Sequence, residues 1–335
     1  MRPLLFLLGL LACLAPALIG ATAQPPAQNR VAVRLQRTAT PSPRVASAIT
    51  TSSISATDAG APPAFDRDFP DPSVILAGRT YYAFSTHTPW ETAGHVFPIL
   101  ESTDLASWRY AGDVFSAPPA WGRGDWWAPA VVARAGTYFL YYSGLDPSGV
   151  HCAAVATATT AAGPYSDHGP IACQDGTQAS GYIDASPLVT HDRGYLYFSV
   201  DGPQHHSISV LPLNDDMVSI AGPRVELFGV TQGWEAIGNR TVEGPSAFVW
   251  GSRYVILYSG GDWRGQYGMG YAVANSPTGP FVKSDTPLLR NGGSLSGPGG
   301  GSFFTDFRGR PWLAYHAWIG GGRDLYLSPL SISLP

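Results

Sequence analysis

The sequence has few charged residues and almost no lysine. Asp, Glu, Lys and Arg together make up 13% of the 335 residues, which is about half the usual share. Lys283 is the only lysine. From residue 64 onward the chain has 15 basic and 23 acidic residues, a net charge of −8 with histidine neutral. This negative charge disfavours nucleic acid and other polyanions as partners.

Helical patterns are also missing from most of the chain. Beyond about the first twenty residues, no long segment repeats apolar residues with the 3.6-residue helical period. Glycine and proline number 39 and 30, and aromatic residues make up 12% of the chain. This composition is typical of many short strands joined by turns around a sizeable core. The sequence therefore predicts an all-β fold.

Cysteine is scarce as well, with Cys13, Cys152 and Cys173 as the only three. The sequence contains no CxxC and no HExxH motif, so a zinc site lacks neighbouring ligands. If Cys13 leaves with a signal peptide, the remaining even pair in an exported protein is most simply a disulfide. Its loop of about twenty residues should contribute about 3 kcal/mol through the unfolded state.

Residues 1–23 are predicted to be a secretory signal peptide. Arg2 gives a positive start, an apolar run extends from Leu4 to Ile19, and Ala21-Thr22-Ala23 supplies a small-residue cleavage site. The apolar run is too short to span a bilayer comfortably, so no membrane association is expected after cleavage. We therefore expect a secreted protein, with lipid anchoring at Cys13 or a periplasmic location as the alternatives.

Residues 24–63 are predicted to be a disordered linker. This segment is rich in Ala, Thr, Ser, Pro and Arg and shows no apolar periodicity. The folded domain is expected to cover residues 64–335 and to begin near Asp66.

This domain contains a repeat of about 57 residues. Aromatic residues that start strand-like segments follow one another at spacings of 57, 57, 59 and 58, at Tyr81, Tyr138, Tyr195, Tyr254 and Trp312. Each repeat contains about four such segments separated by turn residues. A four-stranded unit cannot bury both of its faces alone, and a radial arrangement leaves no long exposed edge. The sequence therefore predicts a five-bladed β-propeller with about four antiparallel strands per blade, since a pair of β-sandwiches would not explain the even period.

Three carboxylates occur at similar places in this repeat. Ten or eleven residues before each aromatic starter stand Asp71, Trp127, Asp184, Glu243 and Gly301. The first strand of a propeller blade lines the central channel, so these positions are expected to converge on one cavity. A single acid of this kind often only caps a turn. Three like charges in one channel are costly unless a function uses them.

Glycoside hydrolysis is a function that requires such carboxylates. One protonated acid delivers a proton to the leaving oxygen, and one ionised carboxylate activates water or attacks carbon. A third acid nearby raises the pKa of the proton donor. The longer side chain of Glu243 is suited to reach the glycosidic oxygen.

The repeats carry, in chain order, the motifs DFPDPSVI, DWWAPAVV with YFLYYSG, GYIDASPLV, TVEGPSAFVW and PWLAYHAW. As an ordered set these motifs resemble those of glycoside hydrolase family 43, the inverting arabinan- and xylan-degrading propellers. The resemblance implies that Asp71 is the general base, that Asp184 tunes and orients the acid, and that Glu243 is the general acid. Ala130 and Ala185 depart from residues that the family often carries, which leaves the subfamily and substrate open.

The resemblance also implies a role for His316 in the PWLAYHAW motif. It would help to hold a water-ligated structural calcium ion at the propeller axis, and no organic cofactor is expected. Taken by itself, a histidine in an aromatic strand is more often a hydrogen-bonded core residue.

Four further residues are expected to bind the sugar by stacking or hydrogen bonding, namely Trp90, Trp127, Trp263 and Arg323. Trp126 and Trp234 lie in similar polar or glycine-rich stretches, where simple packing is the alternative. His205 and His206 lie in a polar turn and are expected to be solvated.

The resemblance thus implies an inverting glycosidase that cleaves α-L-arabinofuranosyl or β-D-xylosyl linkages in arabinan or arabinoxylan. Its partner is an oligo- or polysaccharide, and we expect a monomer. One alternative is a retaining fructan-type propeller with Asp71 as nucleophile, although its usual acid motif has Cys where Gly244 follows Glu243. The other is a carbohydrate-binding propeller without turnover.

Overall fold

The computed structural model describes residues 52–57, 61–88, 95–173, 181–203 and 205–335. The predicted signal peptide and most of the predicted linker lie outside these residues. All regular elements in the described ranges are β-strands. Within the same ranges, no element is a helix of the length and hydrophobicity needed to span a membrane. The predicted all-β class is confirmed.

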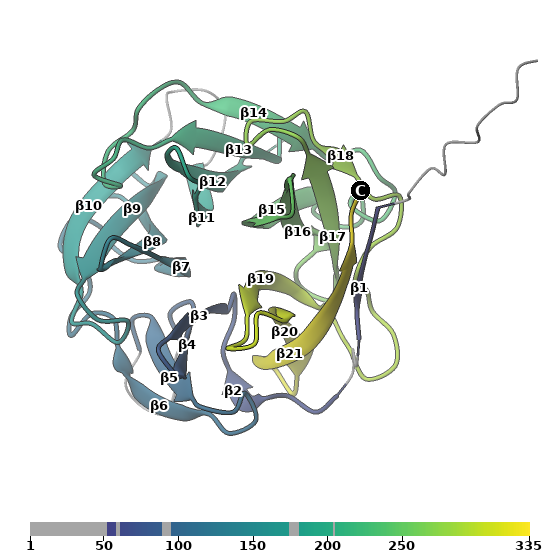
Figure 1. The fold of residues 1–335 in the computed structure, drawn as a ribbon, viewed down its shortest axis with the longest axis horizontal. Coiled ribbons are helices and arrows are strands. Elements are labelled where there is room, and N and C mark those ends of the chain that lie inside the picture. The colour runs from purple at the N-terminus through teal and green to yellow at the C-terminus, as the bar shows by residue number, and fades with distance from the viewer. Residues whose placement is uncertain (1–51, 58–60, 89–94, 174–180, 204) are drawn as a thin grey trace, which may run out of the picture. The chain divides into compact units, whose positions relative to one another are not determined.

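The strands form blades arranged around a central axis (Figure 1). The first blade contains β3 (Ser73–Ala77), β4 (Thr80–Phe84), β5 (Pro98–Ser102) and β6 (Arg109–Asp113). The second contains β7 (Trp127–Arg134), β8 (Thr137–Leu145), β9 (His151–Ala158) and β10 (Ser166–Cys173). The third contains β11 (Gly181–Val189), β12 (Gly194–Asp201), β13 (Ser207–Pro212) and β14 (Val225–Gly229). The fourth contains β15 (Thr241–Trp250), β16 (Arg253–Asp262), β17 (Gln266–Ala274) and β18 (Val282–Lys283).

The fifth blade combines the two ends of the described domain. Its strands β19 (Gly299–Thr305), β20 (Pro311–Ile319) and β21 (Gly322–Ser333) come from the end of the chain. Both β1 (Ser53–Ala56) and β2 (Phe65–Asp68) pair antiparallel with β21. The N-terminal strands therefore cover an edge that would otherwise be open, and this closes the ring.

Strand β1 corrects the predicted linker of residues 24–63 at its C-terminal end. Ser53–Ala56 form a paired strand, and Ile54 is buried in a cluster with Leu313 and Leu330. The order of this segment depends on a distant strand and not on its own composition, which is why the local sequence pattern did not reveal it.

The hydrophobic core is divided among the interfaces between neighbouring blades. Five clusters of buried residues each combine side chains from two adjacent blades. The second strand of a blade is buried on both faces because successive side chains point in opposite directions. In β8, for example, Tyr142 packs toward the first blade and Tyr141 toward the third. Aromatic residues of the second strand thus pack neighbouring blades against each other. The predicted disulfide between Cys152 and Cys173 joins β9 to β10.

A ring of inter-blade hydrogen bonds, here called the belt, surrounds the axis. In each blade one residue in or just before the first strand has a positive φ. Its backbone N–H donates to a side chain near the end of the second strand of the preceding blade, at 2.8–3.0 Å. The donors are Asp71, Ala128, Asp184, Gly244 and Gly300. Their acceptors, in the same order, are His316 Nδ1, Thr86 Oγ1, Ser143 Oγ, Ser199 Oγ and Ser259 Oγ.

The belt also corrects the equivalence that the repeat predicted. Asp71 and Asp184 occupy matching belt positions, but the fourth blade has Gly244 there, and Glu243 stands one residue earlier. The belt positions in the second and fifth blades are likewise Ala128 and Gly300. The first strands of the last four blades contain bulges close to these positions. A bulge adds a residue to one strand of a pair, so counting back from the second strand gives an error of one.

Candidate active site

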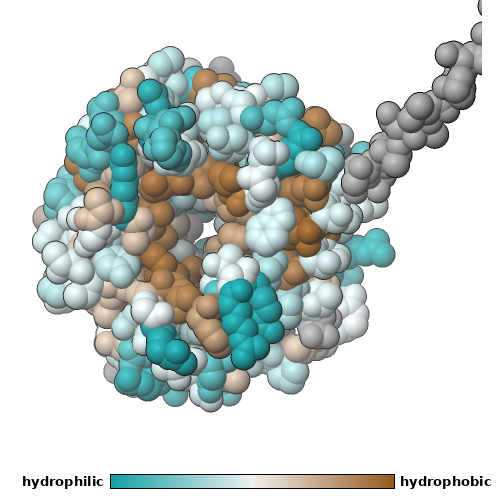
Figure 2. Space-filling model, in the orientation of Figure 1, coloured by the Kyte–Doolittle hydropathy of each residue, from teal (hydrophilic) through white to brown (hydrophobic). Residues whose placement is uncertain are grey.

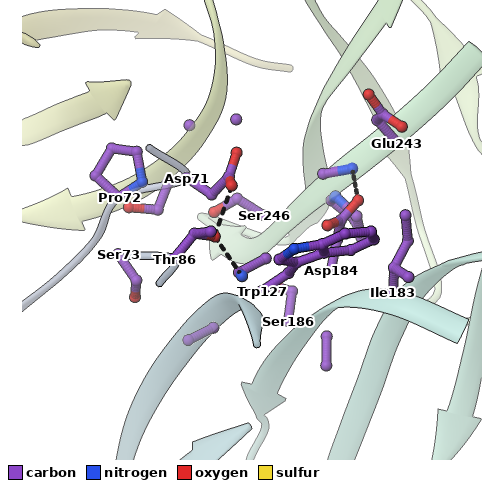
Figure 3. A pocket seen from close by; sticks show the side chains of 18 of the residues that line it. Asp71, Pro72, Ser73, Thr86, Trp127, Ile183, Asp184, Ser186, Glu243 and Ser246 are labelled. Carbon is purple, nitrogen blue, oxygen red and sulfur yellow. Dashed lines mark hydrogen bonds between the residues drawn. The ribbon is translucent and has the colours of Figure 1, made fainter. Parts of the chain in front are cut away.

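A pocket of about 490 Å³ lies at the axis and takes residues from all five blades. On the face shown in Figure 2, hydrophobic residues gather around a central hollow. Seven of the predicted site residues line the pocket, namely Asp71, Trp127, Asp184, Glu243, Trp263, His316 and Arg323. The eighth, Trp90, lies outside the described residues. The three carboxylates therefore converge, as the repeat predicted, on one cavity (Figure 3).

Asp71 is held in the pocket by its backbone and by a hydroxyl group. Its φ of 53° lies in the left-handed region, and its N–H donates to His316 Nδ1 at 3.0 Å. The hydroxyl of Thr86 donates to Asp71 Oδ2 at 2.7 Å, and the guanidinium of Arg323 lies 3.8 Å from the same oxygen. A carboxylate fixed in this way and 23% exposed is suited to take a proton from a water molecule.

Asp184 adopts the same backbone conformation in the third blade, with a φ of 57°. Its Oδ2 accepts hydrogen bonds from the Gly244 N–H and the Ser199 hydroxyl, both at 2.9 Å. Burial, followed by the charge of Asp71, raises the pKa of Asp184. The two donors act in the opposite direction because they stabilise the ionised form.

Glu243 lines the same pocket from β15. Tyr267 donates to its Oε1 at 2.6 Å, and Thr241 donates to its Oε2 at 3.3 Å. Burial raises the pKa of Glu243 to about 8, and the charge of Asp184 adds to this effect. Because Asp184 has the stronger set of donors, we place the proton of this interacting pair on Glu243. The protonated carboxyl has the state that a general acid needs near neutral pH.

His316 is fully buried and neutral, since burial lowers its pKa to about 3. Its Nδ1 accepts the Asp71 N–H, so the neutral ring carries its proton on Nε2, a buried atom that finds no hydrogen-bond partner among the described residues. A protonated nitrogen cannot ligate a cation directly. The described residues also contain no group of three or more His, Cys, Asp or Glu side chains able to hold a metal. These side chains do not by themselves form a calcium site.

Two tryptophans contribute aromatic surface to the pocket. The ring of Trp127 stacks on His151 with centroids 4.4 Å apart. Trp263 is 40% exposed and stacks on Trp318, and the guanidinium of Arg323 lies within 6 Å of both of these rings. Such surfaces are suited to stack against a sugar ring.

Two other tryptophans and two histidines are placed differently. Trp126 is buried in the core between the first two blades, and Trp234 stacks on Tyr258 outside the pocket, so packing is the correct interpretation for both. His205 pairs with Glu226 at the surface. The expectation that His206 is solvated is wrong, because it lines the pocket with its side chain 18% exposed.

Sequence reasoning missed the residues that hold the carboxylates. Thr86, Ser199 and Tyr267 each donate to one of the three acids. A signal for the first two was present, since a Ser or Thr stands near the end of the second strand in four of the five repeats. Tyr267 had no such signal, because aromatic residues are frequent throughout the strands.

Comparisons with known proteins agree with this geometry. Residues 62–332 match the family model for Glycosyl hydrolases family 43. The chain is 29% identical over 272 residues to β-D-galactofuranosidase xynD of Aspergillus niger, covering 76% of this chain and 75% of that protein. It is 28% identical over 281 residues to a probable arabinan endo-1,5-α-L-arabinosidase A of Aspergillus flavus, covering 73% of this chain and 81% of that protein.

Solved structures of glycoside hydrolases are also similar to this chain. A thermostable family-43 glycoside hydrolase superposes with a TM-score of 0.70 at 26% identity, covering 80% of this chain and 93% of that one. An endo-1,4-β-xylanase from Bacteroides thetaiotaomicron gives a TM-score of 0.69 at 29% identity, covering 82% and 97%. The predicted family and enzyme class are confirmed: this chain belongs to family 43 of the glycosyl hydrolases.

Proposed function

We propose that this glycoside hydrolase is a secreted, inverting enzyme that cleaves α-L-arabinofuranosyl or β-D-xylosyl linkages in plant cell-wall polysaccharides. The observation that carries the proposal is the difference between two carboxyls in one pocket. Desolvation raises the pKa of the Glu243 carboxyl to about 8, whereas the Asp71 carboxylate accepts a hydrogen bond from the Thr86 hydroxyl and lies 3.8 Å from the Arg323 guanidinium. Relatives named as an arabinan endo-1,5-α-L-arabinosidase and an endo-1,4-β-xylanase support the substrate class.

In the proposed reaction, Asp71 takes a proton from a water molecule as the water oxygen attacks the anomeric carbon. Glu243 gives its proton to the glycosidic oxygen as the bond between carbon and oxygen breaks. Asp184 stays ionised and keeps the pKa of Glu243 high until the proton is transferred. The hydroxyl of Tyr267 then stabilises the Glu243 carboxylate that forms. An inverting reaction predicts a separation of about 6.5–9.5 Å between the two reacting carboxyl groups.

The test is a screen on an aryl α-L-arabinofuranoside, an aryl β-D-xyloside and linear arabinan, with NMR detection of the first anomer released. The inverted anomer is expected, together with losses of at least about a hundredfold for D71A and E243A. The retained anomer would instead support the fructan-type mechanism with Asp71 as nucleophile. Binding of the same sugars without cleavage on long incubation would support a carbohydrate-binding propeller.

An aryl β-D-galactofuranoside belongs in the same screen, because one relative is named as a β-D-galactofuranosidase. Galactofuranose and arabinofuranose share the five-membered ring, so one pocket shape is compatible with both. Turnover of this substrate above the arabinofuranoside would reassign the sugar and leave the proposed acid and base unchanged.

Secretion, the calcium ion and the monomeric state remain predictions. The disulfide between Cys152 and Cys173 supports an oxidising compartment, and mass spectrometry of the exported protein should find a start after residue 23. A chelator that leaves both activity and the melting temperature unchanged would contradict the structural calcium ion. Light scattering of the purified enzyme tests the monomer.

A further inference from the structure

One wall of the pocket carries a chain of polar side chains that ends on Glu243. Its Oε2 is 3.3 Å from the Thr241 hydroxyl, which is 3.1 Å from His206 Nδ1. The same nitrogen is 3.2 Å from Asp201 Oδ1. All four residues line the pocket. The proposed reaction uses Glu243 and gives the other three no role.

The chemistry of these groups fixes the direction of the hydrogen bonds. A carboxylate at Asp201 requires a proton on His206 Nδ1, because an unprotonated nitrogen would place two acceptors against each other. The Nδ1–H then also faces Thr241, so that hydroxyl accepts from His206. The single hydrogen of the hydroxyl remains free to point at Oε2 of Glu243. If Nδ1 carried no proton, the Thr241 hydroxyl would donate its hydrogen to the imidazole of His206. Its hydrogen bond to Glu243 would then be lost.

We propose that Thr241 and His206 are positioning residues for the general acid, with Asp201 selecting the histidine tautomer that makes this possible. The inference rests on the proposed role of Glu243. Thr241 is buried, with 1% of its surface exposed, so its hydroxyl has no bulk water to replace either partner. Together with Tyr267 on Oε1, it gives each oxygen of Glu243 one protein donor.

The consequence for catalysis is a stronger acid. Donors on both oxygens stabilise the carboxylate that forms when the proton leaves, which opposes the effect of burial on the pKa. They also fix the rotamer of the carboxyl, so its proton is presented in one direction.

The charged or titratable groups that surround Glu243 belong to separate elements. They are Asp71 before β3, Asp184 on β11, Asp201 on β12, Tyr267 on β17, His316 on β20 and Arg323 on β21.

The test compares matched variants on two aryl glycosides that share a sugar, one with a dinitrophenyl and one with a methylumbelliferyl leaving group. T241V removes the hydroxyl at nearly constant volume, and T241S keeps it. For T241V we expect about a tenfold loss of kcat on the poorer leaving group, little loss on the dinitrophenyl glycoside, and a basic limb of the pH profile about one unit higher. T241S should recover both properties, and T190V, on a turn outside the pocket, should match the parent.

A second pair keeps the inference testable if T241V does not fold. H206A frees the Thr241 hydroxyl to turn away, whereas the side-chain amide of H206N is able to replace the Nδ1–H donor. H206A should shift the basic limb in the same direction as T241V, and H206N should restore it. Equal pH profiles and equal leaving-group dependence in both members of each pair would overturn the inference.

The variant E243Q separates this failure from a failure of the proposed function. If Glu243 is the general acid, E243Q loses activity mainly on the poorer leaving group. If E243Q shows no such selectivity, the proposed role of Glu243 is wrong and the inference falls with it. If E243Q shows it while the Thr241 and His206 variants do not, only the inference is wrong.

Discussion

At the scale of single residues, the site removes the Glu243 carboxyl from solvent, which makes its negative charge costly. The folded protein raises the pKa of Glu243 to about 8, compared with about 4.3 for an unperturbed glutamate. A raised pKa means that the stability contributed by the protonated form is present at low pH and is lost as the pH rises toward 8. Glu243 should therefore destabilise the enzyme increasingly above pH 4.

This predicts that E243Q is more heat-stable than the parent at high pH. The difference in melting temperature should be small at pH 4, grow up to about pH 8 and then level off, while activity on poor leaving groups is lost. Differential scanning calorimetry across this range measures it. D285N, at an exposed position, is the control and should show no growing difference. A constant offset for E243Q at all pH values would contradict a raised pKa for Glu243.

Gly300 shows why one belt position requires glycine. Its φ is 55°, and a Cβ there would collide with the Asp71 carboxyl and the His316 ring. Gly309 has a similar φ of 74° but open space around it. We expect G300A to lose most activity by displacing Asp71, in addition to the backbone strain of about 1–2 kcal/mol that both variants share. G309A should keep its kcat, and urea titrations with steady-state kinetics separate the two effects.

At the scale of elements, the belt links each first strand to the blade before it. Ser143 on β8 accepts the N–H of Asp184 on β11, and its side chain is fully buried. S143A would leave that buried N–H without its partner, at a cost of about 1–3 kcal/mol. It should also lower kcat because Asp184 loses its anchor. S148A, in an exposed turn, should change stability by less than about 0.5 kcal/mol, and equal urea midpoints for both variants would argue against the belt.

The strands themselves were predictable because their signals are local. Alternating apolar residues and Gly or Pro turns marked the four strands of the third and fourth blades, and the structure has them at β11–β18. The exact belt positions were not predictable, since a bulge in β15 depends on its pairing with β16. His206 was misplaced for a similar reason. Its polar sequence neighbours suggested solvent, whereas its contact with Thr241 is made across two blades.

At the scale of the folded domain, the ring depends on its first and last strands meeting. The period of the repeat predicted five blades, but the fifth repeat supplies only three strands of its own. The remaining pairing comes from β1 and β2 on opposite halves of β21. Such long-range pairings leave no trace in local composition, so the start of the fold was set too late by about ten residues.

Two truncated enzymes test whether β1 contributes to this closure. A chain that begins at residue 49 keeps β1, and one that begins at residue 61 removes it together with Ile54, which is 6% exposed. Loss of one buried isoleucine and its strand pairing should lower the unfolding free energy by about 2–4 kcal/mol. Both chains retain every residue that lines the axial pocket, so kcat at low temperature should be equal. Equal melting temperatures would show that β2 alone closes the ring, and unequal kcat values would show that closure reaches the catalytic carboxyls.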